Sequence, residues 1–352
     1  MYVFKEIPAN EVVWESIEST YDSTVFHSQK WANYLNNIHN SPIIFSVSEA
    51  DAIIGYFVGV KKWVGVKMIC APMDGTGTYT QGLCFKEPVS DEKRITVYKE
   101  LAEWLFKERK ASYLQVDDWQ LRITKPDWEA IDSHELLNTF SIKHKMRTTI
   151  EISLDIPEEE MWKRLHYKSC KYSINKAQKL GLHTRIIDKI EDIPEFARIH
   201  YEHVANVHKR HGTRTKMTQN RKRMQKLCEA LFPDRGLMIQ VLGNDENGQE
   251  QVMSSAIFGF DKGECIYYTS GSYMQYLKYC PNELMLWEAM KILHQRGAGT
   301  LNFGGMASYK LKFGSQYAFV PKFHFSKYEF IYDLKHLAWK TYHGFRKLIK
   351  SE

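Results

Sequence analysis

"PNELMLWEAMKILHQRGAGTLNFGG", residues 281–305, contains a helix, the signal that ends it and the strand that follows. Pro281 suits a first helical position, where a backbone N–H is not needed, and the apolar residues after it recur at helical spacing. Gly297 is typical of a helix C-terminus, and the short strand behind it runs into Gly304 and Gly305. The stretch predicts a helix packed on a sheet, with a glycine pair where a strand ends.

The segments before this helix predict the sheet it covers. Three stretches alternate as antiparallel strands should, at residues 236–245, 250–263 and 265–273. A helix is predicted over 157–180, because Pro157 and three acidic residues begin it and Gly181 follows it. A polar helical region, residues 191–232, lies between them.

The first third of the chain predicts the same order of elements. Two helices are followed by antiparallel strands, a third helix and another strand, and Ser28 is a candidate cap of the second helix. With 352 residues, the chain is long enough for two domains. We expect an α/β (α+β) protein in which each domain is a mixed, mostly antiparallel sheet flanked by helices. The expected units are residues 1–155, residues 156–330 and a C-terminal helix, residues 331–352.

Composition narrows the class of protein. The six cysteines show no metal-ligand spacing, which argues against a zinc site or a disulfide framework. The apolar stretch at residues 52–60 is far shorter than the roughly 20 residues of a spanning helix, and the acidic start is unlike a signal peptide. We therefore expect a cytoplasmic protein without a metal, with contact at the inner face of the membrane as a further expectation.

The loop after the glycine pair carries the first candidate site. Backbone amides at Gly304 and Gly305 would be uncovered, so that a phosphate or thioester can approach the main chain. Lys310 follows in "YKLKFG" beside Tyr309, and its ammonium could neutralise charge on an attacked carbonyl or hold a phosphate. The alternatives are a tight turn that only needs a positive φ and a solvated lysine.

Two further positions are candidates for the chemistry. Asp74, in "APMDGTG", is a candidate base or acceptor-orienting group, and a turn-capping aspartate is the alternative. Tyr267 and Tyr268 lie on one predicted strand, so that one of them must face the cleft side unless both pack in the core.

Basic residues are unevenly placed in a chain of net charge +6. Arg164, Lys168 and Lys171 share one helix face and could bind donor phosphates or a tRNA acceptor stem. Residues 208–226 are dense in basic side chains and lack acids, which indicates an anionic partner or a solvated helix face. The segment 331–352 has an apolar stripe bordered by lysines, typical of a helix lying on an anionic membrane or docked on its own domain.

Three motifs in register resemble bacterial Fem-type transferases and their acetyltransferase relatives of the GNAT superfamily. Residues 281–305, followed by Tyr309, Lys310, Phe313 and Gly314, resemble the end of the family's second domain. "FHSQKW", residues 26–31, is similar to an early family motif, and "YKSCKYSINKAQKLGL", residues 167–182, resembles the family's basic helix. The resemblance covers most of the chain.

The resemblance implies tandem GNAT-like domains and transfer of an acyl group to an amine or hydroxyl. The implied donor is acyl-CoA or an aminoacyl-tRNA, and the implied acceptor is an envelope or exopolysaccharide precursor, including a lipid-linked one. It implies that Lys310 and Tyr309 serve the transfer and that His27, Gln29 and Trp31 bind substrate. A protein that binds RNA through residues 208–226, or a scaffold without activity, is the alternative.

Overall fold

The computed structural model describes residues 1–37, 41–63, 67–70, 81–212 and 220–328, together with positions 330 and 341. Asp74 lies outside the described residues. So does the predicted C-terminal helix of residues 331–352, apart from position 341.

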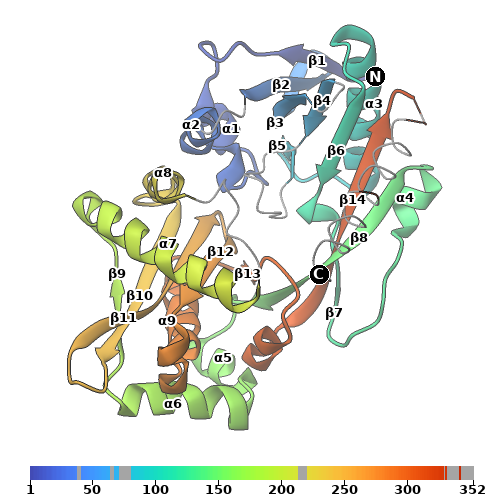
Figure 1. Ribbon diagram of the computed structural model, residues 1–352. Helices are drawn as coiled ribbons and strands as arrows, with labels where there is room; N and C mark the ends of the chain where they lie inside the picture. Colours follow the sequence, from blue (N-terminus) through green and yellow to red (C-terminus); the bar gives the residue numbers. More distant parts are fainter. Residues whose placement is uncertain are drawn as a thin grey trace.

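The described strands form one sheet of fourteen strands that runs through both halves of the chain. Its order is β1-β2-β3-β4-β6-β14-β8-β13-β12-β11-β10-β9, with β5 beside β3 and β7 beside β14. Figure 1 shows the first-half strands in the upper part of the view and the strands from β9 to β13 in the lower part, with the long strands β8 and β14 between them. The two halves are therefore joined by hydrogen-bonded strands.

Each half repeats the predicted order of helices and antiparallel strands. The first half consists of β1 (Val3–Glu6), α1 (Trp14–Glu18), η1 (Val25–His27), α2 (Gln29–Asn37), β2 (Ser41–Glu49), β3 (Ala52–Trp63), β4 (Lys67–Cys70), β5 (Leu83–Phe85), α3 (Asp91–Glu108), β6 (Tyr113–Asp117), η2 (Trp119–Leu121), β7 (Ile123–Lys125), α4 (Glu135–Thr139) and β8 (Lys143–Ser153). The second half consists of α5 (Glu158–Arg164), η3 (Tyr167–Lys171), α6 (Tyr172–Lys179), β9 (His183–Ile186), η4 (Ile190–Asp192), α7 (Ile193–Arg210), α8 (Arg221–Leu231), β10 (Gly236–Asn244), β11 (Glu250–Asp261), β12 (Glu264–Ser272), η5 (Met274–Tyr279), α9 (Pro281–Gln295), β13 (Thr300–Asn302), η6 (Ser308–Phe313) and β14 (Gln316–Ser326).

The stretch that predicted the helix and its strand folds as expected. Pro281 is the first residue of α9, and Gly297, just beyond its end, adopts a φ of 86° that a side chain would disfavour. Strands β10 to β12 pair antiparallel in sequence, as their alternation predicted. Ser28 accepts a hydrogen bond at 3.2 Å from the Trp31 N–H at the start of α2 and is therefore the cap.

The predicted helix over 157–180 is interrupted, and the interruption ties it to the loop of the candidate site. α5 ends at Arg164, and a π-helical turn begins at Tyr167 and leads into α6. Between them, Leu165 is buried and the His166 N–H donates to the Lys312 carbonyl at 2.8 Å. A backbone hydrogen bond to a distant segment has replaced one within the helix, which helical periodicity does not reveal.

Strands are exchanged across the predicted boundary near residue 155. β14, from the end of the second half, pairs antiparallel with β6 of the first half and with β8. β8 in turn pairs with β13 of the second half. The division at 155 stays a prediction, and the pairing means that neither half completes its sheet from consecutive residues alone.

The three largest apolar clusters hold the two halves together. One lies in the second half between the sheet and α9, and another lies in the first half under α3. The third joins the halves, because Val25, Phe26 and Trp31 pack with Phe196 and Leu227 from α7 and α8. Burying large side chains between the halves favours one fixed arrangement over independent motion.

Candidate functional site

The only parallel pairing in the described second half, between β12 and β13, ends after three residue pairs, and we call the place where it ends the opening. Glu264–Ile266 pair with Thr300–Asn302, and beyond these residues the two strands have no pairing in the described register. β12 continues to Ser272, whereas β13 ends and the chain turns at Gly304. Divergence of two parallel strands leaves main-chain groups and side chains accessible between them, which is a usual place for a ligand in α/β proteins.

A bulge on β12 borders this opening. Ile257 pairs with Thr269 and Phe258 pairs with Tyr267, so that Tyr268 has no cross-strand partner on β11. A bulge redirects a side chain and interrupts the ladder, and bulges are enriched beside active sites. Tyr268 also has a buried hydroxyl with no hydrogen-bond partner among the described residues, and its ring lies 6.0 Å from that of Trp31.

The glycine pair forms a turn that hydrogen bonds fix. Gly304 has a φ of 71°, and its N–H donates to Asn302 Oδ1 at 2.8 Å. Thr149 Oγ1, on β8, donates to the same oxygen at 2.8 Å. Asn302 therefore connects the turn to the neighbouring strand and keeps the loop in one position.

Lys310 lies under this turn and is almost fully buried, with 7% of its surface exposed. Its Nζ donates to the carbonyls of Phe303 at 2.6 Å and Gly305 at 3.3 Å, and it lies 5.4 Å from the centre of the Tyr267 ring. Burial lowers the pKa of Lys310 to about 8. The side chain therefore fixes the glycine turn. Because its pKa is lowered, its charge changes within about one pH unit of 8.

Tyr309 is next to Lys310 but remains partly exposed. Its hydroxyl accepts a hydrogen bond from Tyr267, and burial raises the pKa of both phenols. Two linked hydroxyls that stay protonated at neutral pH can donate a proton to a leaving group.

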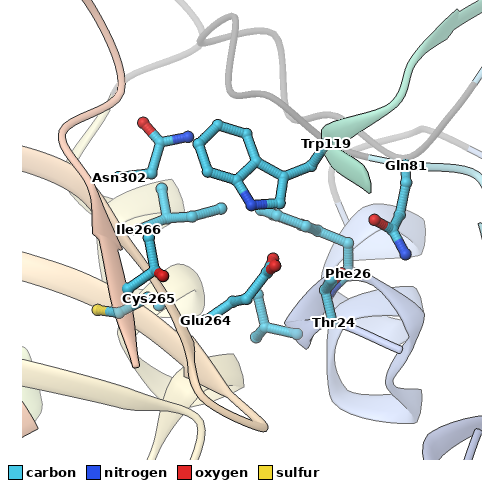
Figure 2. A pocket seen from close by; sticks show the side chains of 11 residues that line it. Thr24, Phe26, Gln81, Trp119, Glu264, Cys265, Ile266 and Asn302 are labelled. Carbon is cyan, nitrogen blue, oxygen red and sulfur yellow. The ribbon is translucent and has the colours of Figure 1, made fainter. Parts of the chain in front are cut away.

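A small cavity on the other face of β12 contains the most perturbed carboxylate of the site. Figure 2 shows Glu264 pointing toward the Trp119 ring, with Gln81 and Thr24 on the opposite wall and Asn302 near the glycine turn. The space open to the centre of a water molecule is about 20 Å³, enough for one ordered water. The cavity combines residues of both halves.

Burial raises the pKa of Glu264 to about 7. Arg122 acts in the opposite direction, Glu151 raises the pKa further, and a hydrogen bond with the Trp119 indole lowers it. Arg122 is itself anchored, since its Nε donates to Glu151 at 3.0 Å and its guanidinium lies 4.5 Å from the Trp119 ring centre. A carboxylate that titrates near neutral pH is well matched to general-base catalysis.

A buried ion cluster supports the first-half wall of this cavity. Arg94 pairs with Asp22 and, at 3.3 Å, with Asp118, and Tyr98 donates to Asp118 at 2.7 Å. Asp118 also caps η2, where its Oδ1 accepts from the Gln120 N–H at 2.9 Å. η2 begins with Trp119, so the cluster fixes the indole that faces Glu264.

The structure brings five of the sequence-predicted residues together. Gly304, Gly305, Tyr309 and Lys310 form the turn and loop, and Tyr268 lies on the adjoining strand. Their catalytic and donor-binding roles stay predictions. The placement agrees with one site at the end of β13.

The other predicted residues lie apart from the turn. His27 and Trp31 are buried at the junction of the halves, and burial lowers the pKa of His27 to about 4, whereas Gln29 is exposed on α2. Lys168 and Lys171 lie on the π-helical turn, and Arg164 ends α5. The predicted roles of these residues in binding the substrate and the donor stay predictions. Only those that are exposed can contact a ligand.

The basic segment 208–226 is divided in the structure. Its start is the last turn of α7 and its end is the first half of α8, and residues 213–219 lie outside the described residues. Arg221 pairs with Glu202 at 2.7 Å, and Arg223 Nε donates to the Tyr34 hydroxyl at 3.2 Å. Two of the segment's arginines therefore bind side chains of the protein itself.

Glu264, Asn302 and Trp119 were not among the predicted site residues. One signal for Glu264 exists in the sequence, because Glu264 precedes Ile266 and Tyr268 on one face of a strand and is the only acidic residue of that strand. A carboxylate at such a position is costly unless it has partners. For Trp119 no local signal exists, because it meets Glu264 only through the contact of the two halves.

No group of three or more His, Cys, Asp or Glu side chains suited to a metal ion is found within the described ranges. The helices described in the structure include none long and apolar enough to span a bilayer.

Gly304→Ala should disrupt the turn, whereas Gly305→Ala should not. A Cβ at Gly304 would lie 2.9 Å from the Tyr267 carbonyl oxygen in a left-handed conformation, which costs about 1–2 kcal/mol before any clash. A Cβ at Gly305 meets nothing within 4 Å. We expect urea denaturation to show a loss of at least about 1 kcal/mol for the first variant and less than about 0.5 kcal/mol for the second. Equal losses would contradict the geometry of the turn.

Comparison with known proteins agrees with this architecture. Residues 164–312 match the family model described as an acetyltransferase (GNAT) domain. A crystal structure of FemX superposes with a TM-score of 0.65 at 14% identity, covering 90% of this chain and 96% of that one. A conserved protein of unknown function from Bacteroides thetaiotaomicron gives a TM-score of 0.51 at 9% identity, covering 92% and 100%. A tandem GNAT protein from the clavulanic acid biosynthesis pathway gives 0.46 at 7% identity, covering 92% and 98%.

Among curated proteins, no sequence matches the chain significantly. The family match and the FemX fold confirm the expected GNAT/Fem-like architecture, a mixed sheet rich in antiparallel pairs and flanked by helices. The matched segment includes β12, α9, β13 and Lys310, so the glycine turn, Lys310 and Glu264 lie within the matched residues, whereas Trp119 and Thr149 lie outside them. The match supports acyl transfer as the class of activity.

Proposed function

We propose that this protein, whose second half is similar to a GNAT acetyltransferase domain, transfers an acyl group at the opening between β12 and β13. The observation that carries the proposal is the position of Glu264, a carboxylate whose pKa lies near neutral pH, in the one parallel strand pair described for that half. A bulged strand and a fixed glycine turn lie at the other end of the same strand pair, and the buried lysine lies beneath that turn on the opposite face of β12. Together these features supply a base, donors for an oxyanion and a place for the donor's carbonyl.

In the proposed reaction, Glu264 takes the proton of the acceptor's amine or hydroxyl, directly or through the water that its cavity can hold. The acceptor's nitrogen or oxygen then attacks the donor's carbonyl carbon, and the carbonyl oxygen becomes an oxyanion. The main chain at the Tyr268 bulge and the charge of Lys310 are proposed to stabilise that oxyanion. The bond to the leaving group breaks, and Tyr309 donates its hydroxyl proton to the leaving group. Glu264 then releases the acceptor's proton to solvent and the Tyr309 phenolate takes one up from solvent, which restores both groups.

The donor is proposed to be acyl-CoA, with an aminoacyl-tRNA as the other source of an activated carbonyl. GNAT domains use acyl-CoA as a class, and the match at residues 164–312 supports that choice. The acceptor is proposed to be an envelope or exopolysaccharide precursor, on the basis of the sequence resemblance to Fem-type transferases. Its entry would pass Gln29, the exposed member of the predicted substrate motif.

Calorimetry and thermal unfolding with acetyl-CoA, free CoA and charged tRNA test the donor. We expect acetyl-CoA to bind saturably and to add about 2.7 kcal/mol of stability when present at 100 times its dissociation constant. Gly304→Ala should weaken this binding and Gly305→Ala should not, which locates the donor at the turn. Binding of charged tRNA alone would identify an aminoacyl-tRNA as the donor in place of acyl-CoA. If none of these donors bound, the proposed acyl transfer would be contradicted.

A further inference from the structure

One helix face outside the glycine turn and the Glu264 cavity combines exposed aromatic rings with lysines. The face extends along η3 and α6 in two rows, and its members are Tyr167, Lys168, Lys171, Tyr172, Asn175, Lys176, Lys179 and Leu180. Tyr167 is 77% exposed, Tyr172 64% and Leu180 48%. Large apolar side chains that are exposed next to one another often mark an interaction site. We call these eight residues the lysine-tyrosine face.

The opposite side of the same helix fixes its orientation. Cys170, Ile174 and Ala177 are fully buried, and α6 packs on α9. In Figure 1, α6 lies at the lower edge of the molecule, with its outer side away from the sheet. Packing of the buried side fixes the helix so that the lysine-tyrosine face points to solvent.

The charge of the face is one-sided. The side-chain ammonium groups of Lys168, Lys176 and Lys179 make no ion pair or hydrogen bond with any residue that the structure describes, and the eight lining residues include no acid. Lys171 is anchored differently, since its Nζ donates to the Lys163 carbonyl at 3.3 Å and lies 5.9 Å from the Trp162 ring centre. Three ammonium groups without a partner among the described residues would attract an anionic surface. The two phenol rings beside them suit a surface that is partly apolar.

We propose that the lysine-tyrosine face docks the protein onto an anionic lipid surface. All eight residues line one open hollow along a single segment, residues 167–180, and no second element of the described structure contributes to its lining. A single-stranded nucleic acid is usually followed by a groove that encloses its backbone, and the described structure builds no second wall here. Tyrosine and leucine suit the headgroup boundary, and lysines suit anionic headgroups. This proposal does not depend on the acyltransferase proposal.

Sedimentation with lipid vesicles tests the docking. Vesicles of phosphatidylcholine with one quarter phosphatidylglycerol should bind the protein at 0.1 M salt, and vesicles of phosphatidylcholine alone should bind it weakly. Each lysine near the surface contributes about fivefold to partitioning, so the variant Lys168→Glu/Lys176→Glu/Lys179→Glu should bind at least about a hundredfold less. Tyr167→Ser/Tyr172→Ser should also bind less, and its loss should persist at high salt, where charge is screened.

A matched variant separates the face from net charge. Lys86→Glu/Lys99→Glu/Lys107→Glu changes three exposed lysines of the first half by the same charge. It should retain vesicle binding close to that of the unchanged protein. Equal loss in both triple variants, or no binding to either kind of vesicle, would overturn the proposal. So would tight binding to polyuridylic acid that the face variant abolishes while vesicle binding is absent.

Discussion

Glu264→Gln should lower the acyl-transfer rate by about 10²–10⁴-fold while leaving donor binding nearly unchanged. The amide keeps the shape of the side chain and its contact with Trp119, but it cannot take a proton from the acceptor. The effect should therefore appear in kcat more than in the donor's dissociation constant. Initial rates with a CoA-thiol assay, together with calorimetry of donor binding, measure the two quantities separately.

The pH dependence gives an independent check on the same residue. Because burial raises the pKa of Glu264 to about 7, the unchanged enzyme should lose activity as the pH falls through 7 and the carboxylate becomes protonated. The variant should lack that acidic limb. A residual rate that still falls with a midpoint near 7 would assign the base to another group.

Glu264→Gln should also stabilise the fold at alkaline pH. The folded pKa of about 7 lies above the usual value of 4.5, so the folded protein binds this proton more tightly than the unfolded chain does. Stability is therefore lost as the pH rises from about 4.5 to about 7, and the cost persists above that range. The glutamine removes this cost, so the variant should gain about 1–2 kcal/mol at pH 8 relative to pH 5, after allowance for partial exposure.

A control keeps the catalytic and structural effects apart. Glu250→Gln makes the same substitution at an exposed position that begins β11, the neighbour of β12. It should change neither the pH profile nor the stability by more than about 0.5 kcal/mol. If only the Glu264 variant gains stability while it loses turnover, the carboxylate is kept in the site for catalysis at the expense of stability.

Local signals predicted the second half well because its elements carry their own start and stop residues. Pro281 and Gly297 bound α9, and alternating residues define β10 to β12, so each element is specified within about a dozen positions. The glycine turn and Lys310 were found in the same way. For such elements, the tertiary structure agrees with local preference.

The rest depended on pairings between distant residues. β14 lies between β6 and β8, and no local pattern states which strand a C-terminal segment will join. Leu165 and His166 interrupt a helical pattern because the Lys312 carbonyl takes the His166 N–H. Glu264 became a site residue only when Trp119 of the other half covered it. These features come from long-range contacts, which single-sequence periodicity does not contain.

Arg94→Met should destabilise the protein by about 3–5 kcal/mol, the usual consequence of removing one partner from a buried charge cluster. Arg94 has 5% of its side chain exposed and stands between Asp22 and Asp118, both of which are buried. Methionine fills much of the volume, but it leaves two carboxylates without a cation. Urea denaturation at pH 7.5, followed by circular dichroism, measures the loss.

The deficit of the Arg94 variant should shrink as the pH falls. Burial raises the pKa of Asp118 and the Arg94 charge opposes that rise, so without the guanidinium the folded variant takes up a proton that the unfolded chain does not. The variant's stability should therefore improve relative to the unchanged protein between about pH 7 and pH 5. Lys93→Met is the matched control, since its exposed pair with Glu49 at 2.6 Å should contribute no more than about 1 kcal/mol. If both variants lost the same stability at every pH, the cluster would not be the element that holds Asp118 and, through η2, Trp119 against Glu264.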